Sequence, residues 1–239
     1  MTTSDDQLYR ELFSRKDTEN PSFWARFSEP PDFSGKHVLD VGSGLGAMCA
    51  DVALDGAERV AGLDIKPELV DFARRHIDET YPEIAGKVSF HCMVLGEYDP
   101  SPSFDIIIAK NSFEHIEDPE AMLAEMSRRL KPGGRMFIGF GPLYNSINGA
   151  HMRRLLIPWG HLFLPGELFR RLCEADRGHE IPTLEDLHLN RKSYRYFRRI
   201  FNESGLETVS LNINANRHPA VKVMTLFRRI PFLREMFTV

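Results

Sequence analysis

One short stretch of the chain, residues 38–46 (VLDVGSGLG), constrains the fold more than any other feature. It is an apolar run that leads into a turn with glycine at alternate positions, namely Gly42, Gly44 and Gly46. Glycines leave the backbone without side chains, so a ligand can approach it closely. Asp64 follows 18 residues after Gly46, at the end of a second apolar run, where a carboxylate can accept hydrogen bonds from both ribose hydroxyls. Together these features predict a nucleoside-containing cofactor on a doubly wound α/β sheet.

The spacing of this turn differs from that of dinucleotide-binding proteins. Those proteins use G-x-G-x-x-G, and a helix N-terminus there holds a pyrophosphate. Here the spacing is G-x-G-x-G, and Asp40 precedes the first glycine by two residues. A carboxylate at this position disfavours a diphosphate and favours a cationic group, such as the α-ammonium of a methionine moiety. A strand-to-helix turn that binds no ligand is the alternative interpretation.

The composition predicts one globular domain, or one domain with a lid. The chain has 239 residues, of which 42% are hydrophobic and 27% charged, as is typical of soluble proteins. No apolar run is long enough to cross a bilayer and the N-terminus is too polar for a signal peptide, so we expect a cytoplasmic location. An odd number of cysteines without a C-x-x-C pair predicts reduced thiols and no zinc site; they are Cys49, Cys92 and Cys173.

The net charge of −4 hides an asymmetry between two parts of the chain. Residues 1–150 carry 15 Lys and Arg against 25 Asp and Glu, a net charge of −10, whereas residues 151–239 carry 15 against 9, a net charge of +6. The acidic part holds the glycine-rich turn, which again argues against a polyanionic cofactor. Basic and aromatic residues of the second part fall at helical spacing, so we expect no nucleic-acid partner.

Alternating strand and helix patterns predict a mostly parallel sheet with helices on both faces, a Rossmann-like fold. Strands are expected at 38–41, 60–63, 88–93, 104–109 and 136–140, with helices at 47–54, from Pro67, and from Asp118 to Leu130. Ligands of such sheets bind at the carboxyl ends of the strands. We expect four regions: an N-terminal helical cap (1–34), the Rossmann-like core (35–141), a lid with helices (142–205), and C-terminal strands with a tail (206–239).

The pattern changes after the fifth expected strand. Residues 142–165 are rich in aromatic residues, histidine and proline without a clear period, which favours a lid that binds the acceptor. Helices are expected near 165–173 and 192–204, followed by a strand at 206–213. Residues 221–227 suit either a strand or a helix. The basic C-terminal part and the apolar side chains of its tail permit weak docking to a membrane or a partner; these are Phe232, Met236 and Phe237.

Several short motifs follow one another in a specific order along the chain, and they are residues 38–46, Asp64, 104–107 (FDII), 113–116 (FEHI), Asp118-Pro119 and 130–134 (LKPGG). In these motifs residues 35–141 resemble the class I methyltransferases that use S-adenosylmethionine (SAM), in particular the small-molecule branch that includes the quinone-biosynthesis enzymes. Rossmann dehydrogenases lack the last three of these motifs.

The resemblance implies SAM as the cofactor, with contacts from Asp40, Gly42, Ser43, Gly44, Gly46, Asp64, Ile65, Val94, Leu95, Lys110 and Asn111. The turn and Asp40 would hold the methionine part, and Asp64 the ribose. Adenine would be held by packing and backbone contacts near Ile65 and Val94, because no carboxylate stands there to bind its amino group. The two residues that end the fourth strand would border the sulfonium.

Methyl transfer requires an in-line, water-excluded approach, and a hydroxyl acceptor must also lose a proton to a base. His115 is the first candidate base, because it lies just beyond the fourth strand. His151 and His161 are alternatives in the lid, where Tyr144 and Trp159 could stack on a flat acceptor. The competing interpretation of all these residues is structural. The three histidines share no metal-ligand spacing, so we expect no metal.

The sequence therefore predicts a SAM-dependent methyltransferase that acts on a small, ring-containing acceptor, with oxygen as the favoured atom. One alternative is a protein of the same fold that binds SAM but catalyses another step, such as a cyclisation, or regulates a partner. A second is an oxidoreductase dependent on NAD(P), which the turn spacing disfavours. The sequence defines neither the acceptor nor the oligomeric state.

Overall fold

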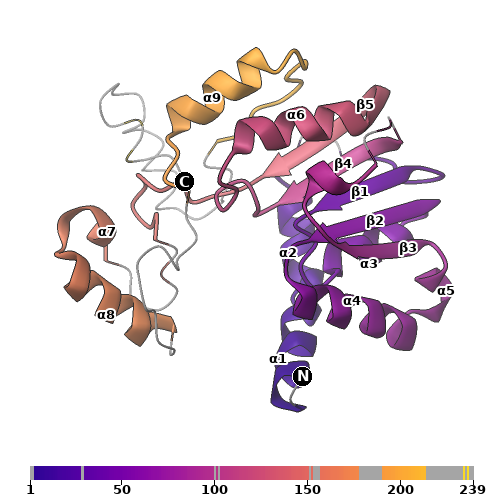
Figure 1. Ribbon diagram of the computed structural model, residues 1–239, viewed down its shortest axis with the longest axis horizontal. Helices are drawn as coiled ribbons and strands as arrows, with labels where there is room; N and C mark the ends of the chain where they lie inside the picture. Colours follow the sequence, from indigo (N-terminus) through magenta and orange to yellow (C-terminus); the bar gives the residue numbers. More distant parts are fainter. Residues whose placement is uncertain are drawn as a thin grey trace. The chain divides into compact units, whose positions relative to one another are not determined.

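A computed structural model describes residues 3–27, 30–99, 101, 103–150, 152, 157–177, 190–213, 234 and 236. The chain divides into two compact units, one of Met1–Ser112 and Glu120–Gly139, the other of Phe113–Pro119 and Phe140–Val239. The first contains every strand of the described chain, and we call it the sheet unit (Figure 1). The second contains helices and loops, and we call it the helical unit.

The sheet has five parallel strands in the order β3-β2-β1-β4-β5. The strands are β1 (His37–Val41), β2 (Arg59–Asp64), β3 (Val88–Cys92), β4 (Phe104–Lys110) and β5 (Leu130–Gly139). The direction of winding reverses between β1 and β4, so the carboxyl ends of these two strands flank the switch point at which such sheets bind ligands. The predicted doubly wound parallel sheet is confirmed.

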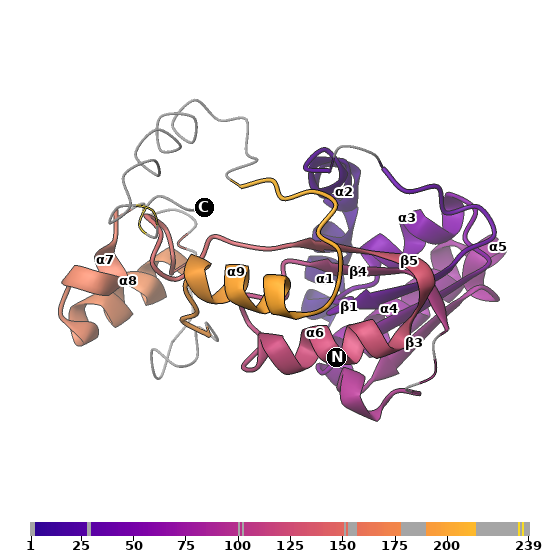
Figure 2. The same cartoon turned by 90° about the horizontal axis from the view of Figure 1, so that it is seen from above.

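Helices cover both faces of this sheet. They are α3 (Ala47–Leu54), α4 (Pro67–Thr80), the short α5 (Pro82–Ala85) and α6 (Pro119–Arg129), with a 3-10 turn at Leu95–Glu97. Helices α3 and α4 contact β1, β2 and β3. Figure 2 shows α6 on the side of the sheet opposite α3. Right-handed crossovers place the helices in this way when the strand order reverses.

Two N-terminal helices, α1 (Thr3–Ser14) and α2 (Lys16–Trp24), belong to the sheet unit. Phe23 of α2 is completely buried, and the indole of Trp24 meets the ring of Phe137 on β5 edge-on at 5.5 Å between centroids. Helix α1 packs on α4, where Tyr9 meets Phe72 at 5.5 Å. The N-terminal segment therefore shares the core of the sheet unit.

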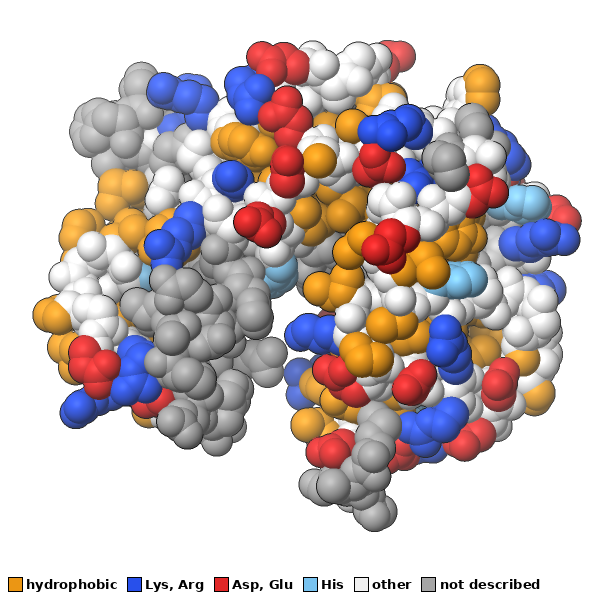
Figure 3. All heavy atoms as spheres, viewed as in Figure 1, with side chains coloured by type: hydrophobic (Ala, Val, Ile, Leu, Met, Phe, Trp, Pro, Cys, Tyr) orange, Lys and Arg blue, Asp and Glu red, His pale blue; other side chains and the backbone are white. Residues whose placement is uncertain are grey.

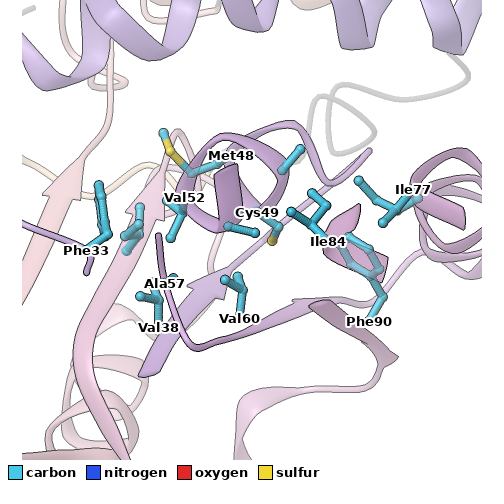
Figure 4. Packing of buried hydrophobic residues seen from close by; sticks show 14 of the residues in the cluster. Phe33, Val38, Met48, Cys49, Val52, Ala57, Val60, Ile77, Ile84 and Phe90 are labelled. Atoms are coloured by element: carbon cyan, nitrogen blue, oxygen red, sulfur yellow. The ribbon is translucent and has the colours of Figure 1, made fainter. Parts of the chain in front are cut away.

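The core beneath the glycine-rich turn is built from apolar side chains of strands and α3. Figure 4 shows Met48, Cys49 and Val52 of α3 lying over Val38 and Val60 of the strands. All of these side chains are buried, as expected of strands covered on both faces. This packing fixes the start of α3, and with it the turn that precedes the helix.

Strand β5 begins earlier than the sequence pattern predicts. Phe104 of β4 pairs with Leu130, whereas Ile106 pairs with Arg135, so the residues between Leu130 and Arg135 form an irregularity within the strand. The ammonium of Lys131 binds Asp105 Oδ2 at 2.9 Å, which holds this irregular segment to β4. The predicted helix end before 131–134 is confirmed by α6, which ends at Arg129.

The helical unit contains α7 (Gly160–Phe163), α8 (Gly166–Arg177) and α9 (Tyr194–Glu203). Ser193 caps α9 by accepting a hydrogen bond from Tyr196 N at 3.1 Å. Gly205 has a φ of 75° just beyond this helix, a left-handed conformation that is common directly after helix ends. A small core of Ala150, Met152, Phe169 and Cys173 lies in this unit.

The strand predicted at 206–213 is absent from the structure. These residues form no regular structure, and Val209 and Leu211 are 70% and 44% exposed. Their alternating pattern is that of a strand, but a strand also needs a hydrogen-bonded neighbour, and none of the described segments pairs with it. The expected element at 221–227 lies outside the described residues. No helix among the described residues is long and apolar enough to span a membrane.

Candidate functional site

The glycine-rich turn is held at the carboxyl ends of β1 and β2. Gly42 N and Ser43 N both donate to Leu63 O, at 2.8 and 2.9 Å. Gly46 has a φ of 81°, and a Cβ there would lie 2.6 Å from the ring of Phe90. The turn therefore rests on this ring. Gly44 also has a positive φ, of 53°, but a Cβ there would meet nothing within 4 Å. The backbone at Gly44 is thus the open side of the turn, where a ligand can approach.

Asp64 ends β2 beside this turn. Its Oδ2 accepts a hydrogen bond from Gly44 N at 2.9 Å, and its Oδ1 accepts one from Lys66 N at 3.0 Å. Each carboxylate oxygen accepts about two hydrogen bonds, so both oxygens keep acceptor capacity. The carboxylate is thereby fixed in orientation and still able to bind a diol.

Asp40 is a buried carboxyl group on β1, with 2% of its surface exposed. The thiol of Cys49 donates to its Oδ2 at 3.5 Å. Burial raises the pKa of Asp40 to about 7, although the Cys49 hydrogen bond and the positive charge of Lys110 act in the opposite direction. Across the described residues, Asp40 takes part in no ion pair. A buried carboxylate without a cation is costly, so the site fits a ligand that brings a positive charge.

Two exposed apolar side chains follow the neighbouring strands β2 and β3. Ile65 is 66% exposed and Val94 is 49% exposed, whereas Leu95 is buried at 2%. Large apolar side chains with this exposure at one edge of a sheet fit the flat faces of an aromatic ring. Of the residues predicted at adenine, Ile65 and Val94 are therefore accessible, and the side chain of Leu95 belongs to the core.

The two residues predicted at the sulfonium end stand at the end of β4. Lys110 Nζ donates to Asn20 Oδ1 at 2.7 Å and pairs with Glu19 Oε2 at 3.4 Å, so helix α2 holds this ammonium. Asn111 has a φ of 53° and donates from its backbone N to Gly139 O at 2.7 Å. Such a left-handed conformation is uncommon outside glycine, although asparagine tolerates it best.

The candidate base His115 lies in the helical unit, in the segment that directly follows β4 in the chain. Its side chain is exposed. Asn190 holds this segment through three hydrogen bonds: Nδ2 donates to Phe113 O at 2.6 Å and Ile116 O at 2.8 Å, and its backbone N donates to Glu114 O at 3.0 Å. The backbone around His115 is thus fixed although the imidazole is accessible.

The other predicted acceptor residues fall in the same unit. His161 Nε2 is hydrogen bonded to Tyr144 O, and because a carbonyl only accepts, Nε2 carries the proton and Nδ1 is the remaining basic atom. Burial lowers the pKa of His161, which favours its neutral form. Trp159 donates from Nε1 to Met236 O at 3.3 Å. The tyrosine ring lies 5.0 Å from the imidazole of His161, whereas His151 lies outside the described residues.

Sequence reasoning missed three residues that support these groups. Phe90 underlies the turn, Asn20 binds Lys110, and Asn190 holds the segment of His115. Phe90 lies in an expected strand, where its sequence pattern is that of any hydrophobic core residue. The two asparagines lie in polar segments without a motif, and only the tertiary structure reveals their partners. The described residues contain no group of three or more metal-ligating side chains.

Figure 3 shows acidic and basic side chains interspersed over the visible face of the sheet unit. Such mixing differs from the single-sign surface that a polyanionic ligand requires.

Residues 38–134 match the family of methyltransferase domains. The chain is 33% identical over 175 residues to a ubiquinone biosynthesis O-methyltransferase of Coxiella burnetii, a match that covers 66% of this chain and 73% of that protein. It is 36% identical over 107 residues to the enzyme of the same name from Xanthomonas oryzae pv. oryzae, covering 45% of this chain and 44% of the relative. This second match thus spans less than half of the relative's length.

Among solved structures, phosphoethanolamine N-methyltransferase 2 of Haemonchus contortus matches with a TM-score of 0.57 and 21% identity, covering 91% of this chain and 42% of that chain. This likeness supports the fold. Fold and sequence matches together define a methyltransferase of the Rossmann-like class. The chain belongs to the class I SAM-dependent methyltransferases, as its resemblance to their quinone-biosynthesis branch predicted, and the cofactor of this family is SAM.

Proposed function

We propose that the protein transfers the methyl group of SAM to a hydroxyl oxygen of a small, ring-containing acceptor. The observation that carries the proposal is the buried carboxyl of Asp40, which lacks an ion pair among the described residues and lies on the strand that leads into the open turn. A nucleoside that also bears an ammonium group satisfies both features, whereas a dinucleotide satisfies only one. The names of the relatives, ubiquinone biosynthesis O-methyltransferases, support oxygen and an aromatic ring.

Each part of SAM has a candidate partner in the sheet unit. Asp40 would neutralise the α-ammonium, and the backbone of Gly42, Ser43, Gly44 and Gly46 would line the methionine part. Asp64 would bind the ribose hydroxyls, since its two oxygens keep acceptor capacity. Ile65 and Val94 would pack on adenine, with the backbone at Leu95 beside them. Lys110 and Asn111 would border the sulfonium end.

When bound, SAM supplies a methyl group that positive sulfur activates for direct displacement. The protein must position the acceptor oxygen in line, exclude water and remove the hydroxyl proton. We assign the proton to His115, because Asn190 fixes its backbone while its imidazole is exposed. His161, through Nδ1, and His151 are the alternative bases. Tyr144 and Trp159 would stack on the ring of the acceptor.

The expectation of a small-molecule acceptor agrees with the activities stated in the names of the relatives. We include a cytoplasmic location and the absence of a nucleic-acid partner in the proposal, on the grounds of cysteine usage and charge distribution. Weak docking of the basic C-terminal part to a membrane or partner belongs to the same proposal.

The test is calorimetric titration with SAM and with its demethylated product S-adenosylhomocysteine (SAH), followed by transfer of a labelled methyl group to a panel of phenols and catechols. Binding of both ligands and labelling of an aromatic hydroxyl are the expected results. A folded sample that binds neither ligand, or that binds NADH instead, overturns the proposal. Binding without transfer to any acceptor supports the cyclase-like or regulatory alternative.

A further inference from the structure

Asn20 of α2 is a buried amide at the centre of a polar network in the sheet unit. It is 1% exposed. Its Nδ2 donates to Asp51 Oδ2 at 2.8 Å and to Ala47 O at 3.3 Å, and its Oδ1 accepts from Lys110 Nζ at 2.7 Å. The amide orientation is unambiguous, because the lysine ammonium only donates while the carboxylate and the carbonyl accept. Asn20 therefore joins α2 to α3 and to the end of β4.

Asn20 is itself held in place. Asp51 Oδ1 accepts from Lys16 Nζ at 2.8 Å, so both oxygens of this carboxylate are engaged by α2. Phe23, one turn further along α2, is completely buried in the core. Because its amide protons are both used and its position is fixed, the carbonyl of Asn20 is a fixed acceptor for Lys110.

Lys110 and Asp40 lie on the same face of the sheet. Asp40 of β1 pairs in register with Ile108 of β4, and Lys110 is two residues beyond Ile108, where side chains point to the same side. The spacing of strands and the rise per residue place the two Cα atoms about 8 Å apart. An extended lysine side chain spans most of that gap. The positive charge of Lys110 already acts on Asp40, whose pKa burial raises and this charge lowers.

The lysine is thus a cation within reach of a buried carboxylate that has no ion-pair partner in the described part of the chain. Its ammonium nevertheless binds Asn20 and Glu19. We infer that Asn20 is a positioning residue that holds the ammonium of Lys110 on α2 and so reserves Asp40 for the ammonium of the ligand. This inference rests on the proposed function, because it assumes that SAM places its α-ammonium at Asp40.

The experiment is a double-mutant cycle between Asn20→Ala and Lys110→Met, read by calorimetric binding of SAH. When Lys110 is present, the Asn20→Ala substitution frees its ammonium, which can then pair with Asp40 and compete with the ammonium of the ligand. If that pair forms in nine-tenths of the free protein, binding weakens about tenfold. In the Lys110→Met background the same substitution changes affinity less than about threefold, because no competitor remains. A loss of equal size in both backgrounds means that Asn20 serves only to dock α2, and overturns the inference.

Two further readouts separate positioning from mere stability. Lys16→Met loosens the same link between α2 and α3 without touching Lys110, and should weaken SAH binding less than about twofold. A loss as large as that of Asn20→Ala assigns the effect to helix docking and overturns the inference. We also measure the pH at which the affinity for SAH is half of its maximum. This pH should be lower in Asn20→Ala than in the wild type, and adding Lys110→Met should abolish the decrease.

The Asn20→Ala variant can be used only if it is folded, and a cooperative unfolding transition is the criterion. The cycle can still be carried out if this variant fails that criterion. Glu19→Ala then takes its place, since this side chain is 52% exposed and its loss does not threaten the fold. The inference is supported if Glu19→Ala weakens SAH binding about twofold when Lys110 is present and leaves it unchanged in the Lys110→Met background. Equal effects of Glu19→Ala in both backgrounds overturn the inference. Wild-type protein that binds neither SAM nor SAH overturns the proposed function and this inference together, whereas normal binding without coupling overturns this inference alone.

Discussion

Under the proposed function, Asp40 binds the ammonium of the ligand only when it is ionised, so the affinity for SAH should fall steeply below pH 7. Burial raises the pKa of Asp40 to about 7, although Cys49 and Lys110 oppose the shift and Asp64 reinforces it. Protonation then competes with binding. Relative to the fully ionised carboxylate, binding is about twofold weaker at pH 7, about 11-fold weaker at pH 6 and about 100-fold weaker at pH 5.

Calorimetry between pH 5 and 7 measures this slope. The range stops there because an α-amino group has a pKa of about 8 and begins to lose its own charge above that range. At pH 6, binding should release about 0.9 proton, which titrations in two buffers of different ionisation enthalpy reveal. The matched control is Asp40→Asn, which should bind weakly and with little pH dependence. A wild-type affinity that stays constant from pH 5 to 7, or a control with the same slope, refutes the reasoning.

The same variant should reveal the cost of this carboxylate to the fold. Folding raises the pKa of Asp40 from 3.8 to about 7. Its contribution to the free energy of unfolding is therefore fully present below pH 4 and is lost as the pH rises through 7. Raising this pKa from 3.8 to about 7 corresponds to on the order of 4 kcal/mol. Without ligand at pH 8, Asp40→Asn should therefore raise the free energy of unfolding by a few kcal/mol. Chemical denaturation measures the change, and a less stable variant contradicts it.

Three other substitutions test the site and the packing beneath it. Asp64→Ala should weaken SAM binding by about 1–3 kcal/mol through lost ribose hydrogen bonds; unchanged calorimetric affinity would remove this residue from the site. His115→Ala should lower turnover by about 100-fold or more while SAH affinity stays within about twofold; unchanged turnover transfers the role of base to His161 or His151. Gly62→Ala should lower the thermal midpoint, because its Cβ would lie 2.7 Å from the ring of Phe90, and Phe90→Leu in the same chain should reduce that loss; an equal loss in both backgrounds shows that the ring is not the obstacle.

The strands of the sheet could be predicted because each is an apolar run of the length that a doubly covered strand requires. The run 104–109 became β4 almost residue for residue. The turn and Asp64 could be placed because chain order fixes which strand ends meet in a parallel sheet. The positions of side chains and backbone groups at the strand ends could thus be predicted from the sequence, because strand order determines them.

Features that depend on tertiary contacts were not accessible. The alternation at 206–213 predicts a strand, but pairing is decided by a neighbour that the local pattern cannot report. The early start of β5 depends on the pairing of Phe104 with Leu130 across an irregularity. Asn20 belongs to a helix far from the motifs in sequence, and its contact with Lys110 exists only because α2 folds against the end of β4.

In the part of the chain that the structure describes, Asp40 has no ion-pair partner, and a ligand explains this better than folding does. Its neighbours on the same face, Val38 and Ile108, are apolar and fully buried, so an apolar residue at this position would make a more stable sheet. A lysine within reach could have neutralised the carboxylate, yet α2 engages that lysine elsewhere. Two stabilising solutions are therefore forgone at one strand end. Natural proteins retain such a local cost where function requires it, and the binding of a cationic ligand is a function that a buried carboxylate can serve.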